Sequence, residues 1–398
     1  MPTNVEPNEK TAGQQTTIEP ITSTPDDRLR FPEWVMRGSL GELACILARG
    51  TEVPEEFIFA TAITVIGAAC AGDLRLNIGV TAEPRLFTVL LGDSYLARKS
   101  TAMRKVLDFF NSLSLAGPMS VVHGVGSGEG LAKLLNKHGR VLLALDEFRG
   151  FIDKAKIDGS SLLTLAASMY EINDWDNSTK YGDLAVHNGH LAIVGCCTTR
   201  TYSQMWSPDA IALGFPNRLF VVNADAKPKV AWPEPPVEAE LQHVREWLVQ
   251  QFKILPRTLD ITPEAKRRWG EWYESLPDSE HAKRLDTIGY RLMLVLALTN
   301  DKTEVDSEIV EMVIAILNYE LRVRILTDPI DADNTIARLE EGIRRQLGQR
   351  GPLKLRDLKR YTNAQRHGQW AFERALVNVQ RAGEVNFDVA IGVYRLLN

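Results

Sequence analysis

The sequence predicts an α/β protein with a mostly parallel sheet, then an all-helical region and a C-terminal helical module. Apolar, strand-like runs alternate with helical patterns, at 74–79, 85–92, 119–124, 140–147, 189–197 and 218–224. Because these runs are apolar on both faces, we expect a parallel sheet that helices cover on both sides.

Composition limits the protein class. The chain has 398 residues, 44% of them hydrophobic, and a net charge of −5, so two or three domains are expected and any nucleic-acid contact needs a local basic patch. The four cysteines lack metal-ligand spacing and favour a reducing, cytoplasmic environment. The N-terminus has no apolar secretory segment. The uncharged stretch 57–70 is too short to span a bilayer, which predicts a buried helix and no membrane contact.

Composition also divides the chain. Residues 1–30 are polar and predict a disordered tail. Residues 31–227 hold two N-terminal helices and the α/β core, and a proline-rich stretch follows at 228–237. Residues 238–327 predict a helical lid subdomain. Residues 334–398 predict a third domain.

The most informative motif is LFTVLLGDSYLARKST at 86–101. An apolar strand ends at Gly92, a polar loop follows, and Lys99-Ser100-Thr101 opens a helix. This is the layout of a phosphate-binding loop, in which helix amides and a lysine hold an anion and a hydroxyl ligates Mg²⁺. The predicted nucleotide contacts are Gly92, Asp93, Ser94, Ala97, Arg98, Lys99, Ser100 and Thr101.

The loop departs from the usual pattern G-x-x-x-x-G-K-[ST]. Gly92 lies seven residues before Lys99 instead of six, and Arg98 replaces the last glycine. The alternative interpretation is a basic helix start after a buried strand.

A carboxylate pair, Asp146-Glu147, ends the apolar strand at 140–147. Beside a phosphate loop, the first acid organises the metal and the second polarises the attacking water. The predicted metal ligands are Ser100 and Asp146, for Mg²⁺ bound with ATP. An acid that caps the next helix gives the same pattern.

Two further segments carry weaker signals. The strand at 190–197 ends in Thr198-Thr199, where a hydroxyl can hold the attacking water or simply end a strand. The turn GVGSGEG at 124–130 either places Glu129 near nucleotide or DNA, or is a connection in which Ser127 caps a helix.

Three arginines are candidates for stabilising the charge on the transferring phosphoryl group. Arg218 precedes a strand and could act as an arginine finger on a neighbouring subunit, or pair with a local acid. Arg284 and Arg291, seven residues apart on one helical face, could be sensor arginines from the lid.

Residues 334–398 follow the winged-helix order of three helices and a hairpin. They contain 12 Lys and Arg against 6 Asp and Glu, a net +6, which predicts DNA contact; a protein-docking winged helix is the alternative. The predicted DNA-binding residues are Arg356, Lys359, Arg360, Arg366 and Arg374.

The order of these motifs resembles that of the phage- and plasmid-type, primase-associated helicase-like ATPases. The motifs are GDSYLARKST, GSGEGL, a strand ending DEF, a strand ending in Thr, and GF-x-NR. The resemblance covers roughly residues 32–325. It implies a P-loop NTPase core of RecA-like or AAA+-like type, with Lys99 and Ser100 at the phosphates and metal, Asp146 and Glu147 at metal and water, and Arg218 as the finger. In that family the loop also ends in Arg-Lys.

These features predict an ATP-hydrolysing DNA motor, a ring-forming replicative helicase or helicase loader of a mobile element. It would act on single-stranded or forked DNA as a homo-oligomer, with a hexamer as one form, and with any primase supplied separately. One alternative is an ATP-dependent oligomeric switch that recruits a replication, transposition or defence partner without unwinding DNA. Another is a DNA-binding scaffold with an inactive nucleotide site.

Overall fold

The computed structural model describes residues 29–93, 97–113, 119–179, 182–327, 335–389 and 391–397. The tail expected over 1–30 lies outside this part except for its last two residues. The predicted contact Ser94 also lies outside it.

The centre of the molecule is a five-stranded, all-parallel sheet, which confirms the predicted α/β class. Its order is β3-β4-β7-β2-β8. The strands are β2 (Phe87–Leu91), β3 (Ser120–Val122), β4 (Arg140–Leu145), β7 (His190–Cys197) and β8 (Leu219–Asn223). Every residue of β2 and β7 is buried, as their apolar sequences predict.

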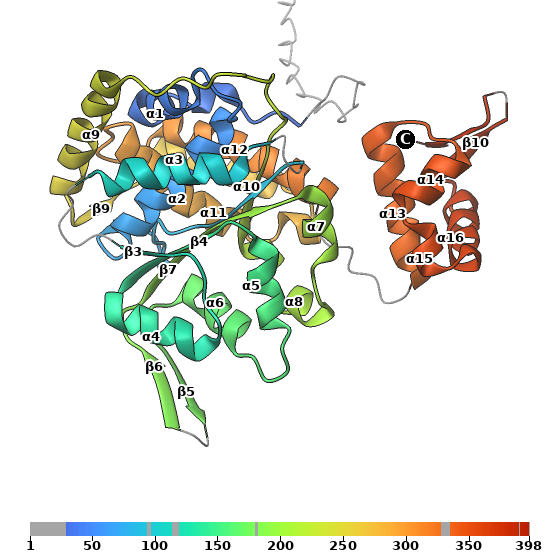
Figure 1. Cartoon of the computed structure of the whole chain (residues 1–398), viewed down its shortest axis with the longest axis horizontal. Helices are drawn as coiled ribbons and strands as arrows, with labels where there is room; N and C mark the ends of the chain where they lie inside the picture. Colours follow the sequence, from blue (N-terminus) through green and yellow to red (C-terminus); the bar gives the residue numbers. More distant parts are fainter. Residues whose placement is uncertain are drawn as a thin grey trace, which may run out of the picture.

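The first of the six predicted strands, at 74–79, is not part of this sheet. Its residues form β1 (Leu74–Leu76), which pairs in parallel with β9 (Arg257–Leu259). The sequence did not predict the antiparallel hairpin of β5 (Trp175–Thr179) and β6 (Gly182–Val186), because β5 is polar (WDNST). Figure 1 shows this hairpin projecting from the body.

Helices cover both faces of the sheet (Figure 1). On one face lie α2 (Glu55–Cys70) and α3 (Lys99–Asn111), with α1 (Gly38–Ala48) packed on α2. On the other lie α4 (Gly128–His138), α5 (Phe148–Ala155) and α6 (Leu162–Glu171). From β2 the chain crosses through α3 to the edge strand β3, and it then returns through α4 to α6 toward β7. Because both crossovers are right-handed but run in opposite directions, their helices lie on opposite faces of the sheet.

The apolar stretch 57–70 lies in α2, which is buried along nearly its whole length. Its burial comes from contact with α1, α3, α11 (Leu285–Thr299) and the sheet. In the part of the chain that the structure describes, no helix is long and apolar enough to cross a membrane.

The helices after residue 237 are α9 (Glu238–Lys253), α10 (Pro263–Glu274), α11 and α12 (Ser307–Thr327). Their buried side chains belong to the same hydrophobic core as the sheet. The expected lid therefore has no core of its own.

Helix α12 closes the sheet at its edge strand β8. The Glu320 carboxylate accepts the Val221 N–H at 3.1 and 3.0 Å, and the Tyr319 hydroxyl accepts the Asn223 N–H at 2.7 Å. At the other end of β8, Arg324 donates to the Leu219 carbonyl at 2.9 Å. These side chains bond backbone N–H and C=O groups of β8 that a sixth strand would otherwise bond, so they block strand pairing at this edge.

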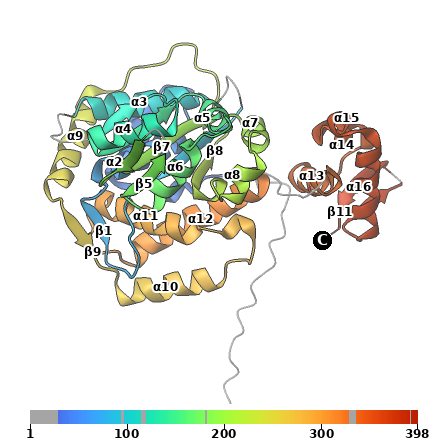
Figure 2. The same cartoon turned by 90° about the horizontal axis from the view of Figure 1, so that it is seen from below.

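The C-terminal unit contains α13 (Thr335–Arg350), α14 (Leu355–Tyr361), α15 (Ala364–His367), α16 (Gln369–Arg381) and the hairpin of β10 (Val385–Asp388) and β11 (Val393–Leu396). Leu353, before α14, adds a short bridge to Tyr394. The unit has a hydrophobic core separate from that of the α/β body. Figure 2 shows its helices packed around one another.

Candidate nucleotide and nucleic-acid sites

The predicted phosphate loop and the carboxylate pair meet at the carboxyl edge of the sheet. Strand register pairs Leu145 with Gly195 and Leu91 with Cys197, and Asp146 and Gly92 directly follow the first residue of each pair. The connection after β2 runs toward β3, while the connection after β7 runs the opposite way to β8. Such a switch between adjacent strands opens a crevice at their carboxyl ends, where α/β proteins bind ligands.

The loop after β2 is closely packed. A Cβ placed on Gly92 would lie 2.6 Å from the Ala97 Cβ, so glycine is required there. Arg98 has a φ of 48°, a left-handed conformation that glycine adopts more easily. Arg98 therefore adopts the left-handed backbone conformation that a glycine at this position would favour. Its guanidinium pairs with Glu52 at 2.6 Å.

Among the described residues, no side chain caps the amino end of α3. Arg98 at the N-cap makes no side-chain capping bond, whereas α4, α5 and α7 (Thr199–Gln204) are capped by Ser127, Glu147 and Thr198. The first amides of α3 thus lack a partner within the helix. The Lys99 Nζ donates to the carbonyls of Gly92 at 2.8 Å and Asp93 at 3.3 Å. This amino end fits an anion.

Lys99 is half-buried among groups of the carboxyl edge. Burial lowers the pKa of Lys99, and Cys196, Cys197, Asp93 and Glu147 act in the opposite direction. A partly desolvated ammonium near two carboxylates suits the binding of a phosphate with its metal ion.

Asp146 and Glu147 are exposed at the tip of β4. Glu147 Oε1 accepts the Arg149 N–H at 3.3 Å and so caps α5, as the alternative interpretation of the pair requires. Its Oε2 has no hydrogen-bond partner among the described residues. Glu147 therefore caps a helix and still has one carboxylate oxygen available at the exposed carboxyl edge.

The structure separates the two threonines at the tip of β7. The Thr198 hydroxyl accepts the Thr201 N–H at 3.1 Å and donates to the Thr201 hydroxyl at 2.8 Å. Within the described chain the Thr199 hydroxyl has no such partner. Thr199 is thus the more available of the two for a water or a phosphate.

The glycine-rich turn at 124–130 ends in a capped helix. The Ser127 hydroxyl accepts the Gly130 N–H at 3.2 Å. The pKa of Glu129 is lowered by its own backbone amide and by Ser127. These contacts place Glu129 in the first turn of α4 and account for it without a ligand.

The three candidate arginines lie at the opposite, amino edge of the sheet. Arg218 precedes β8 and is only 8% exposed; its Nη1 donates to the carbonyls of Leu213 at 2.8 Å and Gly214 at 2.9 Å. The five residues of β8 separate this edge from the phosphate loop by about 17 Å. Arg218 therefore cannot contact a nucleotide bound in its own chain.

The expectation for Arg284 and Arg291 needs correction. Helix α11 begins at Leu285, so Arg284 precedes the helix and the two do not share a helical face. Arg291 is buried and donates to the Arg85 carbonyl at 2.7 Å, with its guanidinium 3.9 Å from the Tyr170 ring centre. Both lie at the amino edge, so neither can be a sensor for the same chain's nucleotide.

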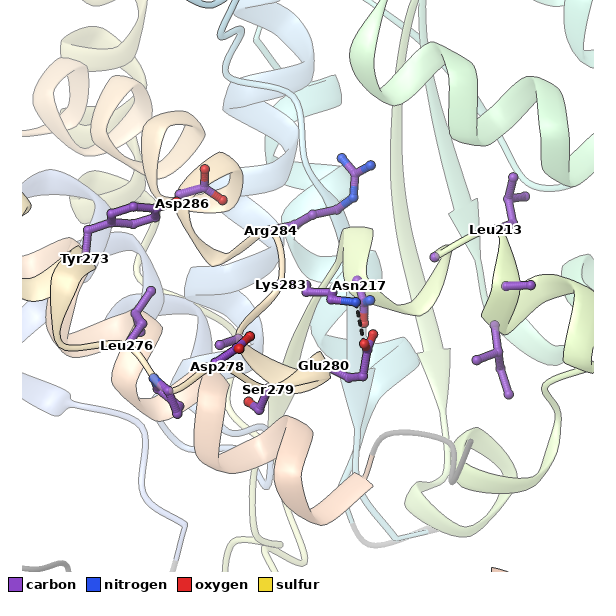
Figure 3. Close-up of a pocket in the computed structure, with 15 residues that line it drawn as sticks. Leu213, Asn217, Tyr273, Leu276, Asp278, Ser279, Glu280, Lys283, Arg284 and Asp286 are labelled. Atoms are coloured by element: carbon purple, nitrogen blue, oxygen red, sulfur yellow. Dashed lines mark hydrogen bonds and ion pairs between the residues drawn. The ribbon is translucent and has the colours of Figure 1, made fainter. Parts of the chain in front are cut away.

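Arg284 borders an open depression of about 690 Å³ on this edge. Figure 3 shows its lining, which includes Asn217 and an ion pair between Lys283 and Glu280. Arg284 itself pairs with Glu171. Its side chain is 34% exposed, which makes it more accessible than Arg218.

The donors at the carboxyl edge fit Mg²⁺. A hydroxyl on Ser100 and a carboxylate on Asp146 are hard oxygen ligands, and both side chains lie near Cys196. Among the described residues no three His, Cys, Asp or Glu side chains form a metal cluster. The remaining ligands would come from phosphate and water, as is usual for Mg²⁺.

The C-terminal unit gathers the predicted DNA-binding residues on α14 to α16. Arg356, Arg366 and Arg374 are exposed, while Lys359 lies 3.7 Å from Glu373. Arg360 stacks on the Tyr361 ring at 4.7 Å.

Sequence reasoning missed two residues at these sites. Arg350 stacks on the same Tyr361 ring at 4.1 Å, so two guanidinium groups concentrate positive charge there. Glu52, which holds Arg98, also accepts the Val230 N–H at 3.0 Å. No local signal marks either residue, because each acts through a partner distant in sequence or in a different helix.

No model of a known protein family matches the chain, and no curated protein is significantly similar to it.

Proposed function

We propose that this chain is an ATP-hydrolysing DNA motor, a ring-forming helicase or helicase loader with a P-loop-type core. The observation that carries the proposal is the carboxyl edge between β2 and β7. There a helix start without a side-chain cap and with Lys99, a reversal in the direction of the strand connections and the exposed pair Asp146-Glu147 come together. This combination matches what phosphoryl transfer to water requires.

In this proposal the amides of α3 and the Lys99 ammonium hold the phosphates. The Glu147 carboxylate accepts a proton from the attacking water, whose oxygen forms the new bond to the γ-phosphorus as the bond to ADP breaks. Ser100 and Asp146 would hold Mg²⁺, which would neutralise part of the phosphate charge. Thr199 orients the water or the γ-phosphate.

The basic C-terminal unit supports the DNA part of the proposal. Its order of helices, with Leu353 bridging the terminal hairpin, fits a winged helix. Its charge of +6 contrasts with −5 for the whole chain. The exposed arginines of α14 to α16 would contact phosphates.

The test is ATP turnover with and without single-stranded DNA. Lys99→Ala should lower turnover at least about 100-fold, because the main positive charge at the phosphates is lost. The control is Lys105→Ala, on the same helix, where Lys105 Nζ bonds the Leu47 carbonyl instead. Turnover by Lys99→Ala at the wild-type rate would overturn the site.

One observation favours the second candidate, an oligomeric ATP-dependent switch. Arg218, the expected arginine finger, donates hydrogen bonds to carbonyls of its own chain. In this arrangement it does not contribute a free guanidinium to ATP bound by a neighbouring subunit. Strand displacement on forked DNA separates the two functions: the motor unwinds the fork with ATP, and the switch does not.

A further inference from the structure

The C-terminal unit contains an open groove of about 630 Å³ where α13, α15 and α16 meet. Its lining combines an aromatic ring, small apolar side chains and hydrogen-bonding groups. The residues that matter for its chemistry are Ile336, Glu340, His367, Trp370, Ala371 and Asn378.

Trp370 is the most unusual residue of this groove. It is 72% exposed, although Phe372, two residues along α16, is fully buried in the core of the unit. The fold therefore does not use the indole for packing. A large, flat, exposed ring at the side of a groove is a surface on which another planar group can stack.

The polar wall of the groove offers hydrogen-bond acceptors. Glu340 Oε1 accepts from Asn378 Nδ2 at 2.5 Å. The second carboxylate oxygen of Glu340 and the side-chain carbonyl of Asn378 remain as acceptors. A carboxylate repels phosphate but accepts N–H groups, such as the exocyclic amine of a nucleobase.

The surroundings of the groove are basic. Arg366 is exposed next to His367, and Arg374 is exposed one helical turn beyond Trp370, on the same side of α16. Together with the net +6 of the unit, these arginines favour a polyanion whose backbone passes outside the groove.

We propose that this groove binds an unpaired base of single-stranded nucleic acid, with Trp370 as the stacking platform. The indole ring supplies stacking, the acceptors supply hydrogen bonds to the base edge, and the flanking arginines pair with phosphates. These are the three contacts that such a strand needs. A base inside a duplex is already stacked and cannot enter. The inference rests on the proposed function only in assigning DNA to the C-terminal unit.

The test measures Kd by fluorescence anisotropy with the full-length protein. The probes are an oligodeoxycytidine of about 20 nucleotides, an abasic strand of equal length, and a duplex. Trp370→Ala should raise Kd for the oligodeoxycytidine about tenfold or more, the usual effect of losing one base stack. Trp370→Phe should retain most of the affinity. The duplex and abasic Kd values should change less than about twofold.

Trp232→Ala is the matched control, because Trp232 is another exposed tryptophan, at 88%, outside the C-terminal unit. It should leave every Kd unchanged. Three outcomes would each overturn the proposal that the groove binds a base. They are an unchanged Kd for the oligodeoxycytidine in Trp370→Ala, equal losses of affinity for all three probes, and no DNA binding by the wild type. Lys99-dependent ATP turnover without DNA is measured in parallel, and its absence would overturn the proposed nucleotide site instead.

Discussion

The two edges of the central sheet both carry charged side chains but use them differently. At the amino edge, Glu83, Arg85, Arg218 and Arg291 are buried and bonded to neighbouring backbone or side chains. At the carboxyl edge, Asp146 and Glu147 are exposed and α3 starts without a cap. Buried charges with fixed partners hold architecture together, whereas exposed charges around an open helix start remain available for a ligand.

The largest expected effect is at the carboxyl edge. Glu147→Gln should lower kcat for ATP roughly 10²- to 10⁴-fold with little change in KM, because glutamine cannot accept the proton of the attacking water. Steady-state ATPase assays measure this. Asp153→Asn removes another exposed carboxylate of α5, one paired with Arg149 at 3.0 Å, and should keep near wild-type kcat. Equal kcat in both variants would show that this edge does not carry the chemistry.

At the amino edge the effect should fall on stability. Arg291→Met leaves the Arg85 and Tyr170 carbonyls without their donor and should lower the free energy of unfolding by about 3 kcal/mol. Urea denaturation measures it. Arg267→Met is the control, since Arg267 pairs with Glu271 on the surface of α10, and should cost about 0.5 kcal/mol or less. A raised KM for ATP with unchanged stability in Arg291→Met would contradict the structural role.

Acid should weaken the amino edge selectively. Burial raises the pKa of Glu83, but the His190 hydrogen bond and the Arg85 charge outweigh it and hold that pKa at about 2. Because this value lies below that of the unfolded chain, the stabilisation is complete above about pH 5 and is lost as pH falls toward 2, up to about 3 kcal/mol.

The check is the free energy of unfolding against pH for wild type and Glu83→Gln. The variant should be less stable at neutral pH and should lose less stability between pH 5 and 2. Glu264→Gln, at an exposed position in α10, should follow the wild-type curve. Parallel curves for wild type and Glu83→Gln would refute the assignment.

The smallest expected effect concerns Arg98. Arg98→Gly relieves the left-handed backbone but loses the partly exposed pair with Glu52, so stability should change by less than about 1 kcal/mol. The KM for ATP should stay within about threefold, because the guanidinium is engaged by Glu52. A KM raised tenfold or more would instead show that Arg98 leaves Glu52 and joins Lys99 at the phosphates.

Sequence patterns predicted what depends on neighbouring residues. Five of the six apolar runs became the strands of the parallel sheet, and in 334–398 the structure has one helix more than expected, the short α15, before the terminal hairpin. The hairpin of β5 and β6 was missed because its first strand is polar. The helical face expected to carry both Arg284 and Arg291 was wrong, because α11 begins at Leu285, one residue after Arg284.

By itself, the sequence determined the local units: a strand, a glycine turn and a lysine-led helix at 86–101, a carboxylate pair at a strand end, and a basic C-terminal unit. These follow from short-range rules of backbone conformation and apolar periodicity. Only the tertiary structure decided that Lys99, Glu147 and Thr199 share one edge while Arg218, Arg284 and Arg291 share the other. Strand order and crossover direction set that division, and both arise from packing between segments far apart in the chain.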